Sequence, residues 1–371
     1  MMRIAIDARE LGGQPTGVGR FLSEILREWA GLPAARTHEF ILCAPGPIEL
    51  PVSTRRLRAR VEVGTGSGTH WEQIVLPRML RRIDASVLLA PGYSGPLFAD
   101  TPMVVAIHDV SFAAHPEWFR WREGLRRRFL TRNAAQRAAR VITISEFSRR
   151  EIVEHLGVLE SQIDVVYPGV TQPAYTQRLR TGSREPAVLY VGSLFNRRHL
   201  PELIRGFSSL AARHPDIRLD IVGDNRTFPH IDVERVARDS RAADRVRILP
   251  YVDDTVLGRL YADAGAFAFL SEYEGFGLTP LEALAADVPI VVLDTAVARE
   301  VCGPAAIYVE RPEPALIEGA LERALFDEPV RARVLEHAGG VLARYSWRTC
   351  ASRVLDILVA SSVDQPRDSA L

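Results

Sequence analysis

Short apolar runs rich in Val and Ile alternate with longer helical patterns through the first half of the chain. Continuous apolar runs of this length are typical of parallel strands that are buried on both faces. The runs are Arg3–Ala8, Phe40–Ala44, Val61–Val63, Ser86–Ala90, Met103–Ile107, Val141–Ile144 and Ile163–Val166. The helical patterns between them are Gly19–Trp29, Trp71–Arg82, Glu123–Ala139 and Glu146–Leu156. This alternation predicts a doubly wound α/β domain.

A second series of strands and helices follows a stretch that has no apolar periodicity. We assign this stretch, 173–186, to a linker between an N-terminal domain at 1–172 and a C-terminal domain at 187–345. A last helix, at about 346–361 with Ser346 as its N-cap, is expected to cross back to the first domain, and 362–371 to form a disordered tail. The strands of the second series are Val188–Val191, Arg218–Val222, Val246–Leu249, Ala266–Leu270 and Pro289–Leu293.

Charge balance and residue usage exclude several classes of protein. The 371 residues include 46 basic and 46 acidic ones, so no net charge would hold the chain on nucleic acid. All the basic residues are arginine, which excludes Schiff-base lysine chemistry and a P-loop lysine. Cys43, Cys302 and Cys350 have no paired spacing, so we expect small buried residues rather than a disulfide or a zinc site.

No apolar run has the length of a membrane span, and we expect the chain to be cytoplasmic. One stripe, in which Trp118, Phe119 and Trp121 interleave with arginines, could lie against anionic lipid at the inner face of the membrane or hold an anionic acceptor. The alternative is an ordinary solvated helix face. The arginines are Arg120, Arg122, Arg126, Arg127 and Arg128.

The most informative stretch is Ser271–Ala283. It follows a buried strand, and its Gly-Phe-Gly turn at 275–277 precedes helix formers, so backbone amides gather at a helix N-terminus that favours anions. Glu274 suits sugar hydroxyls or positive charge developing on an anomeric carbon, and Glu282 suits ribose hydroxyls. The alternative is a buried acid paired with an arginine, or a surface acid at a helix start.

Two adjacent arginines follow the first strand of the second series. Arg197 and Arg198 lie at the carboxyl end of that strand, where two guanidiniums can neutralise a diphosphate. No two aspartates are separated by one residue, so the chain lacks the Asp-x-Asp clamp that holds a metal and a pyrophosphate. We therefore predict an anion site without a metal, although an Arg-Arg pair by itself is more often a solvated surface patch.

Candidate residues of the first domain lie at the ends of three strands. Gly17 and Gly19 open a helix, where they can approach a phosphate or can serve only a tight turn. A third glycine and an acid after the second strand are missing, which argues against NAD. His108 is expected to face a cleft, or to satisfy loop backbone groups, and Ser145 is expected to cap a helix. No Gly-x-Ser-x-Gly elbow supports a hydrolase.

Further motifs lie in order along nearly the whole chain. They are Asp7-Ala8-Arg9, Thr16–Arg20, Trp71-Glu72-Gln73 with Leu76-Pro77, His108-Asp109, Thr143–Ser148, Tyr190–Ser193, the Glu-x7-Glu element Glu274–Glu282, and Glu300. In this order the motifs resemble those of the family-four (GT4) retaining glycosyltransferases. That resemblance implies the GT-B fold: two Rossmann-like, doubly wound parallel-sheet domains that face a central cleft.

The resemblance also implies a role for each candidate residue. Its catalytic group comprises Arg197 and Arg198 on the donor diphosphate, Glu274 at the donor sugar, and His108 beside that sugar. The implied donor-binding residues are Gly17, Gly19, Gly192, Ser193, Glu274, Gly275, Phe276, Gly277, Leu278 and Glu282. The implied acceptor-side residues are Trp71, Glu72, Asp109 and Ser145. Family members usually carry lysine where this chain has Arg198, a replacement that keeps the charge but enlarges the head group.

The implied activity is metal-independent, retaining transfer of a hexose from a nucleotide-diphosphate sugar to a saccharide or lipid-linked acceptor, with no cofactor. The N-terminal motifs look closest to bacterial mannosyltransferases of polysaccharide, O-antigen or glycolipid synthesis, so the resemblance implies mannose from GDP-mannose as the donor. Two alternatives stay open: a catalytically idle scaffold that binds a nucleotide sugar, and another nucleotide-sugar enzyme of the same fold, such as an epimerase.

Overall fold

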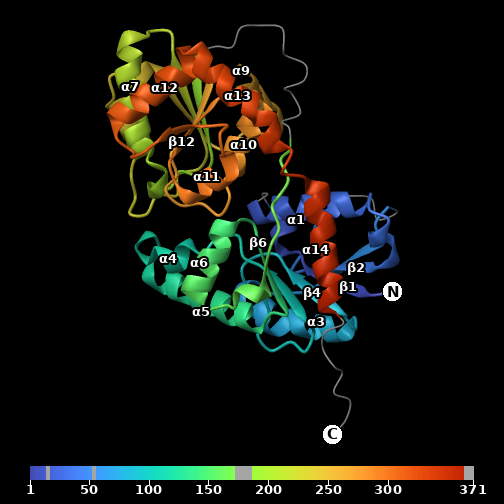
Figure 1. Cartoon of the computed structure of the whole chain (residues 1–371). Helices are drawn as coiled ribbons and strands as arrows, with labels where there is room; N and C mark the ends of the chain where they lie inside the picture. Colours follow the sequence, from blue (N-terminus) through green and yellow to red (C-terminus); the bar gives the residue numbers. More distant parts are fainter. Residues whose placement is uncertain (14–16, 52–55, 172–185, 363–371) are drawn as a thin grey trace. The chain divides into compact units, whose positions relative to one another are not determined.

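The computed structural model describes residues 1–13, 17–51, 56–171 and 186–362. The chain divides into two compact units (Figure 1): unit 1 is Met1–Gly169 together with the chain from Tyr345, and unit 2 is Val170–Arg344. Most of the predicted linker, all but the first residue of the predicted tail, and Thr16 lie outside the described residues.

The described residues of unit 1 form a seven-stranded parallel sheet in the order β3-β2-β1-β4-β5-β6-β7. Its strands are β1 (Arg3–Asp7), β2 (Glu39–Ala44), β3 (Ala59–Val63), β4 (Val87–Ala90), β5 (Met103–Ala106), β6 (Arg140–Thr143) and β7 (Ile163–Val165). Its helices are α1 (Gly17–Trp29), α2 (Gly68–His70), α3 (Leu76–Arg82), α4 (Ser111–Ala114), α5 (Trp121–Arg137), α6 (Glu146–Leu156) and α14 (Trp347–Ser361).

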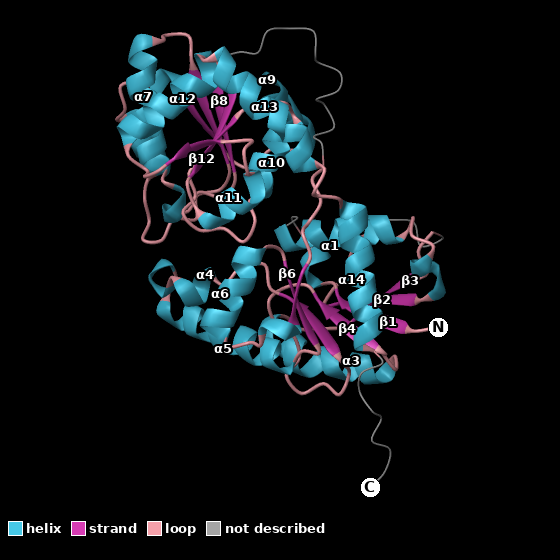
Figure 2. Cartoon of the chain, viewed as in Figure 1, coloured by secondary structure: helices cyan, strands magenta, loops and turns pink. Residues whose placement is uncertain are grey.

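Successive residues of these strands enter two separate hydrophobic cores. Ile4 and Ile6 of β1 pack in the core that α1 and α14 cover, whereas Ala5 packs in the core that α3, α5 and α6 cover. Figure 2 shows the strands enclosed by helices. Because both faces are buried, the strands read as continuous apolar runs rather than as an alternation of apolar and polar residues.

The described residues of unit 2 form a six-stranded parallel sheet in the order β10-β9-β8-β11-β12-β13, so the predicted fold class is confirmed. Its strands are β8 (Ala187–Val191), β9 (Arg218–Val222), β10 (Val246–Leu249), β11 (Ala266–Phe269), β12 (Ile290–Leu293) and β13 (Ile307–Val309). Its helices are α7 (Leu200–Arg213), α8 (Val233–Arg238), α9 (Asp254–Asp263), α10 (Leu278–Ala285), α11 (Ala296–Cys302), α12 (Pro314–Phe326) and α13 (Glu328–Leu342).

Strand β13, the short helix α4 and the helix predicted at 71–82 differ from the sequence prediction. Strand β13 was not predicted, because three residues at the edge of a sheet are too short to show a period. Residues 71–82, predicted as a single helix, instead form a π-helical turn η3 (Trp71–Val75) and α3, and α2 directly precedes them. Pro77 has no N–H to donate to the carbonyl four residues earlier, so the regular α-helical hydrogen bonds are interrupted at this point.

Helix α14 returns to unit 1 and lies beside α1 (Figure 1). Its N-cap is Ser346, whose hydroxyl accepts from the Thr349 amide at 3.4 Å, as the sequence predicts. The indole Nε1 of Trp29, in α1, donates to the Ala351 carbonyl at 2.8 Å, and the Trp29 ring stacks on Phe40 with the centroids 4.8 Å apart. A single buried tryptophan at the end of α1 therefore connects α14 with strand β2.

The structure describes the surroundings of the three cysteines and the lengths of the helices, for which the sequence predicted small buried residues and no membrane span. Cys43, Cys302 and Cys350 are buried and unpaired, and burial raises the pKa of each thiol to about 12. They are therefore inert apolar residues rather than reactive thiols. Within the described ranges, no helix combines the length and the apolar character that a membrane span needs.

Replacing Trp29 by Phe should lower the stability of unit 1 by about 1–3 kcal/mol, because the ring stack survives but the Ala351 carbonyl loses a buried donor and a cavity forms. The melting temperature, followed by circular dichroism, checks this. Trp121→Phe is the matched control, since Trp121 is 68% exposed and should leave the melting temperature unchanged. Equal melting temperatures for the two variants would contradict the role of Trp29.

Candidate functional site

In unit 2, polar side chains gather where β8 and β11 end, and the guanidinium of Arg198 lies at their centre. Its Nε and Nη2 lie 2.9 and 2.8 Å from Oε1 of Glu274, which follows β11. Its Nη1 donates to the Ser193 carbonyl at 2.8 Å and to the Tyr190 hydroxyl at 3.4 Å, both from the β8 segment. The two segments are thus joined by one arginine, although Arg198 and Glu274 are 76 residues apart.

Aromatic rings enclose the same guanidinium. Arg198 lies 4.8 Å from the ring centroid of Phe269 and 5.4 Å from that of Phe195, and its side chain is 11% exposed. Burial by itself would lower the pKa of Arg198, but Glu274 and the Tyr190 oxygen raise it above the ordinary value. The site therefore holds a permanent positive charge.

Glu274 is held from two directions. Besides Arg198, the hydroxyl of buried Ser271 donates to Glu274 Oε1 at 2.8 Å. This is the acid–arginine pair that the structural alternative predicts. Glu274 directly precedes the turn at 275–277.

Arg197 precedes Arg198 in the short 3-10 helix η6 (Asn196–Arg198). Its guanidinium lies over the Phe195 ring, 4.2 Å from the centroid, and its Nε donates to the Tyr273 carbonyl at 3.3 Å. The Glu272 amide in turn donates to the Arg197 carbonyl at 3.0 Å. The structure thus brings Arg197, Arg198 and Glu274 together at one edge of the sheet.

The rest of the motif also lies at this edge. Glu282 is 4% exposed, in α10, and accepts from the Tyr261 hydroxyl at 3.2 Å, so the buried acid has a donor within the protein. Gly275 and Phe276 are buried, and Gly277, at φ 92°, is the N-cap of α10. Leu278 is the first residue of that helix.

Gly192 is required by the packing around Arg198. Its φ is 143°, and a Cβ placed there would lie 2.5 Å from Arg198 Nη1. A Cβ at Gly223 would lie 2.1 Å from the Gly192 carbonyl oxygen, so both loops approach each other through glycine.

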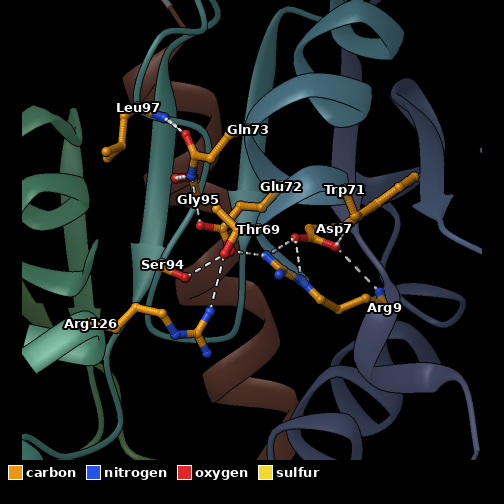
Figure 3. A network of polar contacts seen from close by, with 10 residues as sticks. All are labelled: Asp7, Arg9, Thr69, Trp71, Glu72, Gln73, Ser94, Gly95, Leu97 and Arg126. Atoms are coloured by element: carbon orange, nitrogen blue, oxygen red, sulfur yellow. Dashed lines mark hydrogen bonds and ion pairs between the residues drawn. The ribbon is translucent and has the colours of Figure 1, made fainter. Parts of the chain in front are cut away.

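A second polar network lies in unit 1, at the carboxyl end of β1 (Figure 3). Arg9 donates from Nε to Asp7 at 2.9 Å and from Nη2 to Glu72 at 2.6 Å. The indole of Trp71 donates to Asp7 at 3.2 Å, and the Ser94 hydroxyl donates to Glu72 at 2.8 Å. Asp7 and Glu72 are 1% and 3% exposed, so two buried carboxylates share one guanidinium.

The charges of this network depend on one another. Burial raises the pKa of Asp7, and the positive charge of Arg9 opposes that rise. Burial would lower the pKa of Arg9, but Asp7 and Glu72 raise it above its ordinary value. Of the predicted acceptor-side residues, Glu72 belongs to this network and Trp71 is a core residue that donates to it.

The remaining candidates of unit 1 lie in its loops and helix starts. His108 is buried, with Nε2 2.9 Å from the Pro91 carbonyl; burial lowers its pKa, whereas the Pro91 carbonyl and Asp109 oppose this. Asp109 accepts from the Tyr93 hydroxyl at 2.8 Å and from the Ser111 amide at 2.9 Å. Ser145 is the N-cap of α6, and Gly17 and Gly19 lie in the first turn of α1.

Several residues that bind the predicted site residues in both networks were not themselves predicted from the sequence. Arg9, Tyr190, Ser271 and Tyr261 were not predicted as site residues, although each completes a contact of one that was. A signal existed for Tyr190, because a tyrosine in a buried aliphatic strand needs a partner for its hydroxyl. For Arg9 and Tyr261 nothing in the local pattern points to a partner.

One cluster of the described residues could bring three metal ligands together. Side-chain ligand atoms of Glu151, Glu154 and His155, on α6, lie within 4.8 Å of one another. Glu154 is exposed and His155 already pairs with Glu151 at 3.5 Å, so this is an ordinary helix surface rather than a built metal site.

Two family profiles match consecutive parts of the chain. The family described as Glycosyltransferase Family 4 matches residues 15–172, and the family described as Glycosyl transferases group 1 matches residues 171–339. Together the matches extend over both units, and the boundary between them falls at the unit boundary.

Individual proteins are similar over much of the chain. A glycogen synthase of Mycobacterium tuberculosis is 27% identical over 271 residues, which are 71% of this chain and 64% of the relative. O-antigen chain mannosyltransferase B of Escherichia coli is 26% identical over 280 residues, 68% of this chain and 69% of the relative. The chain thus spans about two thirds of these relatives.

Solved structures share the fold of the whole chain. HepE of Anabaena, crystallised with UDP-glucose, has a TM-score of 0.76 at 18% identity and covers 97% of this chain and 100% of its own. WaaG, a glycosyltransferase of lipopolysaccharide biosynthesis, has a TM-score of 0.69 at 17% identity and covers 96% and 99%. At these identities the likeness concerns the fold.

Replacing Arg9 by Met should destabilise unit 1 by about 3–5 kcal/mol near neutral pH, because Asp7 and Glu72 would stay buried without a counter-charge. Burial already raises the pKa of Asp7, so the folded variant binds a proton more tightly than the unfolded chain. Its stability should therefore rise as the pH falls from about 8 to about 5, which urea unfolding at both pH values measures.

Arg60→Met is the control for Arg9→Met. Arg60 pairs with Glu39 at the surface, with 47% of its side chain exposed, so its loss should cost less than about 1 kcal/mol. Adding Glu72→Gln to Arg9→Met should recover part of the lost stability. A loss at Arg9 that equals the control, or that does not change with pH, would count against the buried network.

Replacing Gly192 by Ala should lower the melting temperature of unit 2 and move the Arg198 guanidinium, because the new Cβ meets Nη1 and the backbone is in a region that alanine avoids. The expected cost is about 1–3 kcal/mol. Gly319→Ala, in the interior of α12 with no atom near its Cβ, should instead be neutral or stabilising by up to about 1 kcal/mol. Equal effects would refute the argument from close approach.

Proposed function

This chain belongs to the GT4-like glycosyltransferases with the GT-B fold, and from that premise we propose that it transfers a hexose from a nucleotide-diphosphate sugar to a saccharide or lipid-linked acceptor. We propose mannose from GDP-mannose as the donor, because O-antigen mannosyltransferases are among the relatives. The transfer retains the anomeric configuration and uses no metal or cofactor.

The observation that carries the proposal is the pair of guanidiniums at the carboxyl edge of the unit 2 sheet. Arg197 and Arg198 lie in one turn, and Arg198 is fixed by contacts to both neighbouring segments. Arginine keeps its charge when buried and offers a planar fork to phosphate oxygens. Two such groups beside the N-terminus of α10 can neutralise a diphosphate leaving group without a metal.

The other candidate residues have roles that fit their surroundings. Glu282, already oriented by Tyr261, would accept from ribose hydroxyls. His108 would contact the donor sugar as a neutral imidazole, because burial lowers its pKa. UDP-glucose in HepE, a protein of the same fold, is consistent with a nucleotide-sugar site.

The anomeric configuration is retained if the acceptor attacks the anomeric carbon from the same face that the diphosphate leaves. The bond from the anomeric carbon to the phosphate oxygen breaks, the acceptor oxygen bonds to the same face, and the acceptor proton passes to the leaving phosphate. Arg197 and Arg198 would stabilise the charge that develops on that phosphate. Glu274, bound to Arg198 and Ser271, would stabilise positive charge on the sugar, and no nucleophile is assigned.

One observation favours a second candidate, a protein that binds a nucleotide sugar without transferring it. Arg198 stands where the family resemblance implies a lysine, and its guanidinium is already satisfied by Glu274, Ser193 and Tyr190. A guanidinium with this many partners in the protein stabilises the fold of the site but has fewer N–H groups left to bind the leaving diphosphate. Turnover distinguishes the two candidates.

GDP should raise the melting temperature equally in magnesium and in EDTA, whereas UDP, ADP, TDP and CDP should raise it less. A ligand at about a hundred times its Kd stabilises the fold by about 2.7 kcal/mol. The wild-type chain should then release GDP from GDP-mannose in the presence of a mannoside acceptor. Arg197→Ala and Glu274→Ala should abolish release, because they remove charge at the leaving group and at the sugar.

Arg235→Ala is the matched control, since this arginine of unit 2 has a side chain that is 72% exposed on α8. It should bind and release GDP like the wild-type chain. Stabilisation that needs magnesium would contradict metal independence, and stabilisation by UDP alone would contradict the donor. Stabilisation without release from any donor would favour the idle candidate.

A further inference from the structure

Helix α5 of unit 1 exposes a row of large apolar side chains. Trp121, Leu125 and Phe129 are 68%, 59% and 62% exposed. Their four-residue spacing places them on one face of the helix. The opposite face packs on the unit through the small residues Gly124, Thr131, Ala134 and Ala135. The fold of unit 1 is thus secured without the apolar row.

Arginines line both sides of this row. Arg122 and Arg126 each follow a row residue by one position, and Arg128 and Arg132 each follow one by three, so the helical repeat puts the two pairs on opposite sides. All four side chains are exposed. The helix carries six arginines and one acid in a chain whose net charge is zero, so positive charge is concentrated here.

Acids do not neutralise these flanking arginines within the described part of the chain. Arg127, which lies off the row, is the arginine of α5 that pairs with an acid, Glu123, at 2.8 Å. Arg122 lies over the Trp121 ring, 5.1 Å from the centroid, and Arg126 donates to the Thr69 hydroxyl at 3.1 Å (Figure 3). The face therefore presents apolar side chains between unneutralised guanidiniums.

We propose that this face of α5 docks unit 1 on an anionic lipid bilayer. The row enters the boundary between headgroups and acyl chains, and the arginines meet the lipid phosphates while their aliphatic stems cover apolar surface. Each arginine at an anionic surface strengthens binding by about fivefold. A second copy of the chain fits this face poorly, because it would bring two sets of like charges together.

The docking face is joined to the polar network of unit 1. Thr69, which accepts from Arg126, lies two residues before Trp71 and three before Glu72. Docking would therefore hold the predicted acceptor side near the lipid headgroups, where a lipid-linked acceptor resides. This consequence rests on the proposed function, whereas the docking itself does not.

The full chain should sediment with vesicles of phosphatidylcholine that contain phosphatidylglycerol, but not with phosphatidylcholine alone, and should dissociate at about 0.5 M salt. Leu125→Ser with Phe129→Ser, and separately Arg122→Gln with Arg128→Gln, should each weaken binding by about tenfold or more. Lipids brominated on their acyl chains should quench tryptophan fluorescence in the wild-type chain and much less in Trp121→Phe. These binding experiments contain no donor or acceptor, so a failure to bind vesicles would contradict the docking proposal but not the proposed transfer reaction.

Tyr251→Ser and Arg235→Gln are matched controls in unit 2, with side chains of comparable exposure, and both should bind like the wild-type chain. Circular dichroism confirms that each variant is folded. The proposal is wrong if the wild-type chain ignores anionic vesicles or if the α5 variants bind as well as the controls. It is also wrong if light scattering finds a dimer that the Leu125/Phe129 variant converts to monomer, since a second copy would then cover the row.

Discussion

The central strands of each parallel sheet are buried on both faces, and this burial limits where polar groups can lie in either unit. In unit 1, successive side chains of the central strands enter one core or the other, as Ile4, Ala5 and Ile6 do in β1. Asp220 is a buried carboxylate inside β9. Its burial is compensated by two hydrogen bonds from the Arg247 guanidinium, at 2.6 and 2.8 Å. Polar groups that serve function are consequently concentrated where strands end and loops begin.

At those strand ends, both units stabilise buried charges by pairing an arginine with carboxylates. An arginine reaches a carboxylate of a distant segment, as Arg9 does to Glu72 and Arg198 to Glu274, and Arg9 also binds Asp7 of its own segment. A guanidinium can donate to several acceptors in one plane without losing its charge, so a chain without lysine can still build dense polar sites. The same residue type, left unneutralised on α5, gives an exposed surface of the opposite character.

Local patterns predicted much of the fold and the location of the candidate site. The apolar runs gave the strands because a strand buried on both faces leaves a continuous signal, and Ser145 and Ser346 were recognisable as helix caps. Glu274 and Glu282 could be placed at a strand end and in the following helix. The three-residue strand β13, at the edge of its sheet, left no comparable signal. The π-helical turn before Pro77 did have a local signal, because a proline without an N–H interrupts the regular hydrogen bonds of a helix.

Local residue patterns are enough to predict two parallel α/β units, the residues at the ends of their strands, and cationic chemistry that depends on arginine. Which of those residues meet depends on how the chain folds. Arg9 and Glu72 are 63 residues apart and Arg198 and Glu274 are 76 apart, and Tyr261 reaches Glu282 from another helix. The physical reason is that periodicity and capping act over a few residues, whereas a buried charge takes its partner from whatever segment the sheet order brings beside it.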